Sequence, residues 1–345
     1  MTTAVAVILL AGVVLYGVFA GADFGAGLWD LTAGGANRGA RARALIDDSV
    51  GPVWEANHTW LIFCLVILWS GFPSAFSAIV TTLYVPLGIA VFGIVLRGSG
   101  FAFRKVSMRT AEQRLNGVAF ASSSVITPFC FGAVVGGVAS GRVPSAGSGN
   151  PVSSWINPTS ILSGVLAVLT CGYLAAVFLT ADAERAGAPD LVQWSRRRTI
   201  LSSVASGGVA FIGLFVLHHD AHRLFHRILT VGWPLIALSA VAGLASAIAT
   251  GTPVLHDRPR LVRPLAVLAV AALLGGWGVG QYPYLLGTHL TIYEAEAPSA
   301  TMASLLAVTG LAVVLVLPSL VWLLTLVDRG QLTDGESPAH SGGAL

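Results

Sequence analysis

The sequence predicts an all-α, polytopic integral membrane protein of about nine transmembrane helices, each a run of about 20 mostly apolar residues. Hydrophobic residues make up 55% of the 345 residues and charged residues only 10%, and the mean hydropathy is +0.79. The Lys and Arg residues gather in alternate segments between the apolar runs. A soluble domain of this length carries far more charge on its surface, so a soluble fold is excluded.

The helices are predicted in two groups and one final span. The first group contains 4–28, 53–70, 74–96 and 117–139, and the second contains 159–181, 200–217, 228–249 and 264–282. The ninth helix is 303–327. We expect a single transmembrane domain over 1–327, with helix groups at 4–139 and 159–282, a polar loop at 143–158 between them, and a disordered cytoplasmic tail at 328–345. The first run has no basic segment before it and no cleavage site, so it is expected to be retained.

The distribution of positive charge predicts the orientation. Of the 19 Lys and Arg residues, all but Arg142, Arg223 and Arg227 fall after the first, third, fifth or seventh helix or in the tail. By the positive-inside rule those segments face the cytoplasm, with the N-terminus outside and the C-terminus inside. The pI near 9.0 is thus explained by topogenic charge, and no nucleic-acid partner is expected. The cytoplasmic set is Arg38, Arg41, Arg43, Arg97, Arg104, Lys105, Arg109, Arg114, Arg185, Arg196, Arg197, Arg198, Arg258, Arg260, Arg263 and Arg329.

Two acids inside apolar runs, Asp23 and Glu55, are the residues that could carry chemistry. Charge in the hydrocarbon region is costly and therefore informative. A carboxyl group in a low-dielectric setting can hold or pass a proton near neutral pH. The structural alternatives stay open: Glu55 as a carboxylate at a helix start, and Asp23 as an interhelical hydrogen-bonding group.

The surroundings of the two acids differ. Asp23 lies among glycines that recur every four residues, Gly17, Gly21 and Gly25, which place small residues on one helix face and allow close approach of another helix. Glu55 follows Pro52, a residue favoured in the first turn of a helix. His58 shares the face of Glu55. The other residues that support this motif are Trp54, Asn57 and Trp60.

The sequence offers no evident ligand set for a redox centre. Cys64, Cys130 and Cys171 lie in apolar runs and form no metal-binding or haem-attachment motif. The cluster HHDAHRLFH (His218, His219, His222 and His226) is expected to be a solvated, weakly basic loop rather than a metal or haem site. His58 is the one histidine well inside a helix. No nucleotide-binding, hydrolase or zinc-protease motif is present.

Several segments together resemble subunit II of the cytochrome bd quinol oxidase family. GADFGAGLWDL in the first helix resembles that family's GxDxGxG signature, and VGPVWEANHTWLI resembles its P-x-W-[DE]-x-N-x-x-W-L-I signature, followed by the turn GFPSAF. TPFCFGAVVGGVASG, WINPTSILSGVLAV and YPYLLGTHLTIYEAEAPSATM follow in the family's order. Three positions depart from the usual pattern: Glu55 stands where Asp is frequent, His58 where Gln is frequent, and Tyr293 where Trp is usual.

The resemblance implies a heterodimer in a bacterial-type plasma membrane that oxidises quinol and reduces dioxygen to water. It places haem b and haem d in a partner, subunit I, and no cofactor on ligands of this chain. It places Glu55 and Asp23 on a cytoplasmic proton path, which His58 and Asn57 adjoin. It also allows a structural quinone and small single-helix accessory subunits. Two other classes stay open: a proton-coupled secondary transporter using the two acids, and a non-catalytic scaffold for a haem-bearing partner.

Overall fold

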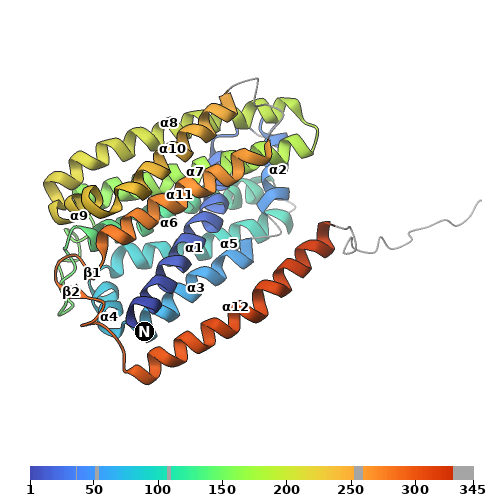
Figure 1. The fold of residues 1–345 in the computed structure, drawn as a ribbon. Helices are drawn as coiled ribbons and strands as arrows, with labels where there is room; N and C mark the ends of the chain where they lie inside the picture. Colours follow the sequence, from blue (N-terminus) through green and yellow to red (C-terminus); the bar gives the residue numbers. More distant parts are fainter. Residues whose placement is uncertain (36, 51–53, 107–109, 252–258, 329–345) are drawn as a thin grey trace, which may run out of the picture.

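The computed structural model describes residues 1–35, 37–50, 54–106, 110–251 and 259–328 (Figure 1). Within these residues, six helices are long and apolar enough to cross a membrane, and a bent helix pair would make a seventh. Two shorter apolar helices, Tyr84–Gly100 and Ser299–Leu315, add to them. The prediction of an all-α, polytopic membrane fold is therefore confirmed.

The elements follow one another as helices, with one small hairpin of strands before the last helix. Their bounds are α1 Thr2–Leu31, α2 Ala40–Val50, α3 Trp54–Gly71, α4 Pro73–Thr82, α5 Tyr84–Val106, α6 Thr110–Ala139, α7 Pro158–Arg185, α8 Pro189–Asp220, α9 His222–Arg227, the π-helical turn η1 Ile228–Gly232, α10 Trp233–Gly251, α11 Pro259–Gln281, β1 Tyr284–Leu286, β2 Leu290–Thr291 and α12 Ser299–Asp328. The strands β1 and β2 pair antiparallel.

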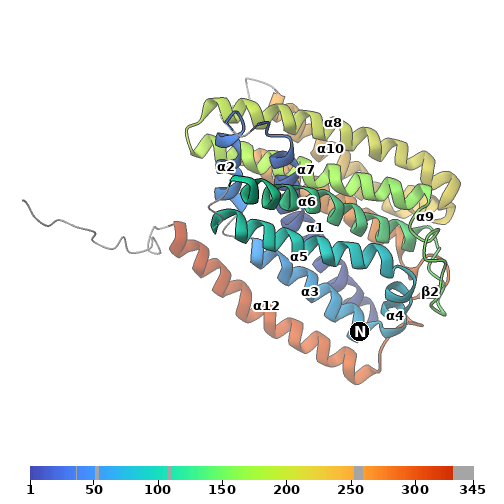
Figure 2. The ribbon, with the colours of Figure 1, turned by 180° about the vertical axis from the view of Figure 1, so that it is seen from behind.

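The long helices run side by side between two ends of the bundle. One end carries α2, and the other carries α4, α9, the β1–β2 hairpin and the N-terminus (Figures 1 and 2). We call them the α2 end and the hairpin end. Helix α1 packs against α3, α6, α7 and α11, whereas α12 lies on the outside against α3 and α1.

The glycines of α1 permit its close packing on α7. A Cβ atom on Gly25 would lie 1.9 Å from the carbonyl oxygen of Cys171, and one on Gly21 would lie 3.1 Å from a methyl group of Leu174. Only a residue without a side chain fits against the α7 backbone at Gly25. The close helix approach predicted from the glycine spacing is confirmed.

The prediction of one continuous helix over 74–96 is wrong, because two helices, α4 and α5, occupy this segment. Helix α3 and α4 are bent by 117°, α4 ends at Thr82, and α5 begins at Tyr84 after a break at Leu83. Pro86 explains the break: in a continuous helix its ring would clash with the carbonyl group of Thr82 and one hydrogen bond would be lost. The short α4 therefore closes the hairpin end, and α5 runs back toward the α2 end.

Helices also extend beyond the apolar runs that predicted them. The segment between the first two predicted helices contains α2, and α8 begins at Pro189 rather than at 200. Arg196, Arg197 and Arg198 consequently lie on a helix. Hydropathy marks only the apolar part of a helix, so polar turns at its ends escape it. The predicted tail lies outside the described residues apart from Asp328.

Candidate functional site

A buried ion pair joins α1 to α5 inside the bundle. Asp23 is 3% exposed and Arg97 is 2% exposed. The guanidinium group of Arg97 donates through Nη2 to the Asp23 carboxylate and, over 2.8 Å, to the Asp23 carbonyl oxygen. Asp23 precedes the end of α1 at Leu31 by two helical turns, about 12 Å along the helix axis. The pair is thus inside the protein rather than at its rim.

The remaining contacts of Arg97 fix its guanidinium group on α6 and on two aromatic rings. Its Nη1 donates to the hydroxyl group of Ser124. Its Cζ lies 4.4 Å from the ring centre of Phe120 and 5.1 Å from that of Phe24. Such cation–π contacts gain strength when desolvated. Gly27 makes room, since a Cβ atom there would lie 2.1 Å from Ser124 Oγ.

The assignment of Arg97 to a cytoplasmic loop is therefore wrong. The apolar run ends near this residue, but α5 continues to Val106, so Arg97 remains inside the helix and turns toward Asp23. An acid within an apolar run needs a compensating partner. An arginine at the end of another apolar run is the signal in the sequence that could have identified that partner.

Asp23 keeps one carboxylate oxygen that is not committed to Arg97. Among the described residues, Oδ2 of Asp23 has no hydrogen-bond partner, and the same holds for the hydroxyl group of Tyr16. Tyr16 lies seven residues earlier, on the same face of α1. Buried polar atoms are nearly always hydrogen-bonded, so these two atoms mark unused hydrogen-bonding capacity in the interior.

The start of α3 lies beside this region of α1. Asn57 is 6% exposed, and its Nδ2 donates to the carbonyl oxygen of Phe19 over 3.3 Å. The rings of His58 and Phe24 are 6.3 Å apart, so Phe24 contacts both His58 and Arg97. Trp60 lies against Phe63 with ring centres 6.2 Å apart. Asn57 and His58 of α3 therefore contact the residues of α1 on either side of Asp23.

Part of the predicted motif cannot be placed. Pro52 and the side chains of Trp54 and Glu55 lie outside the described part of the chain. The backbone of α3 begins at Trp54, which puts Glu55 in its first turn, as the preceding proline predicts. The role of Glu55 stays a prediction.

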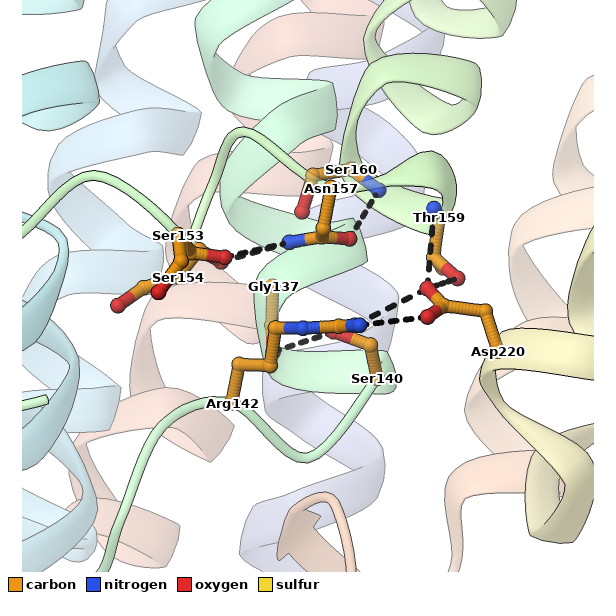
Figure 3. A network of polar contacts seen from close by, with 9 residues as sticks. All are labelled: Gly137, Ser140, Arg142, Ser153, Ser154, Asn157, Thr159, Ser160 and Asp220. Carbon is orange, nitrogen blue, oxygen red and sulfur yellow. Dashed lines mark hydrogen bonds and ion pairs between the residues drawn. The ribbon is translucent and has the colours of Figure 1, made fainter. Parts of the chain in front are cut away.

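A second polar network holds the hairpin end together (Figure 3). Arg142 donates to both carboxylate oxygens of Asp220, over 3.0 and 2.5 Å. Asp220 also accepts from the backbone N–H and the hydroxyl group of Thr159, over 3.2 and 2.5 Å. Asn157 caps α7 by accepting from the backbone N–H of Ser160 over 2.9 Å. These bonds tie the α6–α7 connection to the end of α8, which is a structural role.

Polar contacts connect the two sides of the β1–β2 hairpin to each other and to the start of α1. The hydroxyl groups of Tyr282 and Tyr293 are 2.9 Å apart, and Tyr293 lies 3.3 Å from the hydroxyl group of Thr3. Tyr293, the departure from the usual Trp, thus connects this segment to the start of α1. The backbone N–H and the hydroxyl group of Thr291 donate to Glu294 and hold its pKa below the ordinary value.

Among the described residues, few side chains that could ligate a metal or a haem iron lie close together. No three His, Cys, Asp or Glu side chains among them gather as a metal site. Cys130 and Cys171 are buried and Cys64 is half-buried, each as a free thiol. The histidines of 218–226 are exposed, but the loop predicted for them is wrong, since they lie at the end of α8 and on α9.

Comparison with known proteins decides the family. The family model of cytochrome bd terminal oxidase subunit II matches residues 1–327. The chain belongs to this family. The resemblance read from the two helix signatures is confirmed, and the proton-coupled transporter is not favoured.

Relatives extend the match. Cytochrome bd ubiquinol oxidase subunit 2 of Bacillus subtilis (strain 168) is 29% identical over 177 residues, covering 50% of this chain and 51% of the relative. A putative cytochrome bd menaquinol oxidase subunit II of the same organism is 21% identical over 339 residues, covering 94% and 95%. Cytochrome bd-I ubiquinol oxidase subunit 2 of Escherichia coli (strain K12) is 26% identical over 171 residues, covering 46% and 44%. The chain thus matches about half the length of the first and third relatives.

A solved structure shares the fold. A chain of the bd oxidase from Geobacillus thermodenitrificans superposes with a TM-score of 0.74, at 24% identity, covering 94% of this chain and 98% of that one.

Proposed function

We propose that this chain is the haem-free subunit II of a cytochrome bd-type quinol oxidase, which oxidises quinol and reduces dioxygen to water. The observation that carries the proposal is the family match over 1–327. The partner is a haem-bearing subunit I in a bacterial plasma membrane. A quinone held structurally and small single-helix subunits are further partners that the resemblance implies.

The distribution of histidines in this chain supports placing haem b and haem d in the partner. Haem iron needs axial ligands such as His, Met or Cys inside an apolar pocket. Of the eight histidines, His218, His219, His222, His226 and His289 are exposed, and His256 and His340 lie outside the described residues. His58 alone is partly buried, beside Phe24. Haem supplies the redox chemistry in the complex, and this chain supplies packing surface and ionisable groups.

We further propose nine membrane spans with the α2 end in the cytoplasm. The spans are α1, α3, α5, α6, α7, α8, α10, α11 and α12, arranged as two four-helix groups plus the last helix. Arg41, Arg43, Arg185 and Arg263 support this orientation, because they lie toward the α2 end, opposite the end that holds Arg142, Arg223 and Arg227. Without Arg97, the Lys and Arg residues assigned to the cytoplasmic side still far outnumber those on the other side.

The proton path is proposed to enter at the start of α3. Oxygen reduction consumes protons, which must cross the low-dielectric outer part of the protein to reach the oxygen site. A carboxyl at position 55, the imidazole of His58 and the free oxygen Oδ2 of Asp23 are suitable carriers. Arg97 holds the other oxygen of Asp23, and Asn57 fixes α3 to α1.

Co-purification tests the proposal. The chain, tagged and expressed with its haem-bearing partner, is expected to yield one complex with haem b and haem d absorption bands and quinol oxidase activity. Expressed alone, it is expected to bind no haem. A haem spectrum from the chain alone, or a partner without haem, would contradict the proposal. A pure scaffold would pass this test but would tolerate neutral substitutions of Glu55 without loss of turnover.

A further inference from the structure

Four exposed histidines line one side of the hairpin end and take no part in the proposed function. His218 and His219 end α8, and His222 and His226 lie on α9. The ring centres of His218 and His222 are 5.3 Å apart, and those of His222 and His226 are 4.4 Å apart. The rings of His218, His222 and His226 therefore form a continuous row among exposed residues of the chain.

The Nε2 atoms of His222 and His226 lie close together. The two residues are four apart and share one helix face, and their Nε2 atoms are 3.0 Å apart. Nδ1 of His222 lies 3.1 Å from the carbonyl oxygen of His218. A carbonyl oxygen can only accept, so Nδ1 carries the proton and Nε2 of His222 presents a lone pair. A metal-ligating imidazole typically has this arrangement, with its other N–H held by a backbone carbonyl.

The separation of the two nitrogens fits chelation of one metal ion. Two bonds of about 2.0–2.1 Å place their nitrogens about 2.9 Å apart at a right angle and about 3.3 Å apart at the tetrahedral angle. The observed 3.0 Å lies between these values. We propose that His222 and His226 form a two-histidine site for a transition-metal dication that favours imidazole, namely Cu²⁺, Ni²⁺ or Zn²⁺.

The site is open and completed by solvent. No third His, Cys, Asp or Glu among the described residues joins such a group, and Asp220 is bound to Arg142 and Thr159. The positive charges of Arg223 and Arg227, on the same helix α9, disfavour the binding of a dication there. Their guanidinium groups donate to the carbonyl oxygens of Gly287 and Tyr282, over 2.8 and 3.2 Å, which directs them to the hairpin. With two protein ligands, we expect binding weaker than at a closed site of four protein ligands.

The competing interpretation is a solvated histidine pair joined by an N–H···N hydrogen bond. The test uses the purified complex in detergent, carrying a histidine-free tag, titrated with Cu²⁺–iminodiacetate and followed by electron paramagnetic resonance. Zn²⁺ titration by calorimetry gives a second readout. Haem content and gel-filtration profile establish that each variant is assembled.

The variants separate the site from other copper-binding groups in the complex. His222→Gln and His226→Gln are each expected to weaken binding of one copper equivalent by roughly tenfold or more, because chelation by both rings is lost. His218→Gln and His219→Gln keep the His218 carbonyl group and are expected to change affinity by less than about twofold. Equal losses in all four variants, or wild-type affinity in His222→Gln, would overturn the proposal.

Discussion

Replacement of Arg97 by Met is expected to destabilise the protein strongly. The substitution removes the guanidinium group that compensates the Asp23 carboxylate, and both side chains are almost fully buried. It also removes the bonds to the Asp23 carbonyl oxygen and to Ser124 and the contacts with Phe24 and Phe120. Breaking one side of a buried ion pair costs about 3–5 kcal/mol. At roughly 2 °C per kcal/mol for a long chain, the melting temperature falls by about 6–10 °C.

The matched control removes both charges. Asp23→Asn combined with Arg97→Met leaves no uncompensated charge, so the double variant is expected to be more stable than Arg97→Met alone. The cycle should give a favourable coupling of about 1–3 kcal/mol between the two side chains. Thermal unfolding of the purified complex and the yield of assembled complex measure the effect. An Arg97→Met variant as stable as wild type, or a double variant that loses the sum of both single effects, would refute the reasoning.

Three further predictions test the packing and the orientation. Gly25→Ala is expected to lower the yield of folded protein, because its methyl group would crowd the Cys171 carbonyl group. The control Gly310→Ala is expected to fold normally, since no heavy atom lies within 4 Å of a Cβ atom there. Equal yields of the two variants would contradict the α1–α7 packing. Asp220→Asn is expected to lower the free energy of unfolding by about 1.5–3 kcal/mol, measured by thermal unfolding. Asp190→Asn, whose partner Arg41 is mostly exposed, is expected to lower it by less than about 1 kcal/mol. Similar losses in the two variants would argue against the network at Asp220. A reporter active only in the cytoplasm is expected to work when fused after Arg329 or within 104–114 and to be silent within 143–156; the reverse pattern would overturn the orientation.

The fold class could be predicted from the sequence because the membrane imposes a simple rule. A run of apolar residues in hydrocarbon must satisfy its backbone internally, and a helix does so. The glycine spacing around Asp23 likewise predicts close packing, because only backbone geometry is involved. The break at Leu83 was missed because hydropathy averages over Pro86, whose effect is on the backbone rather than on polarity.

The candidate site could be predicted only in part. Asp23 stands out because an acid in an apolar run is conspicuous, and the motif around Asn57 and His58 marks the start of α3. Arg97 was missed because its partner lies 74 positions away in the sequence. Pairings of that kind depend on tertiary structure. The sequence shows the cluster from His218 to His226, but only the helical geometry shows that two of its nitrogens lie 3.0 Å apart.

The central claim is that protons reach the oxygen site through groups of this chain, with Glu55 as the entry carrier. Glu55→Gln keeps the volume and hydrogen-bonding capacity of the side chain but removes the group that carries the proton. The decisive measurement is quinol oxidase turnover per assembled haem in Glu55→Gln, with Glu55→Asp as the control that keeps the acid. We predict full haem content in both variants, loss of most turnover in Glu55→Gln, and higher turnover in Glu55→Asp. Near wild-type turnover in assembled Glu55→Gln would contradict the account and reduce Glu55 to a helix-start carboxylate.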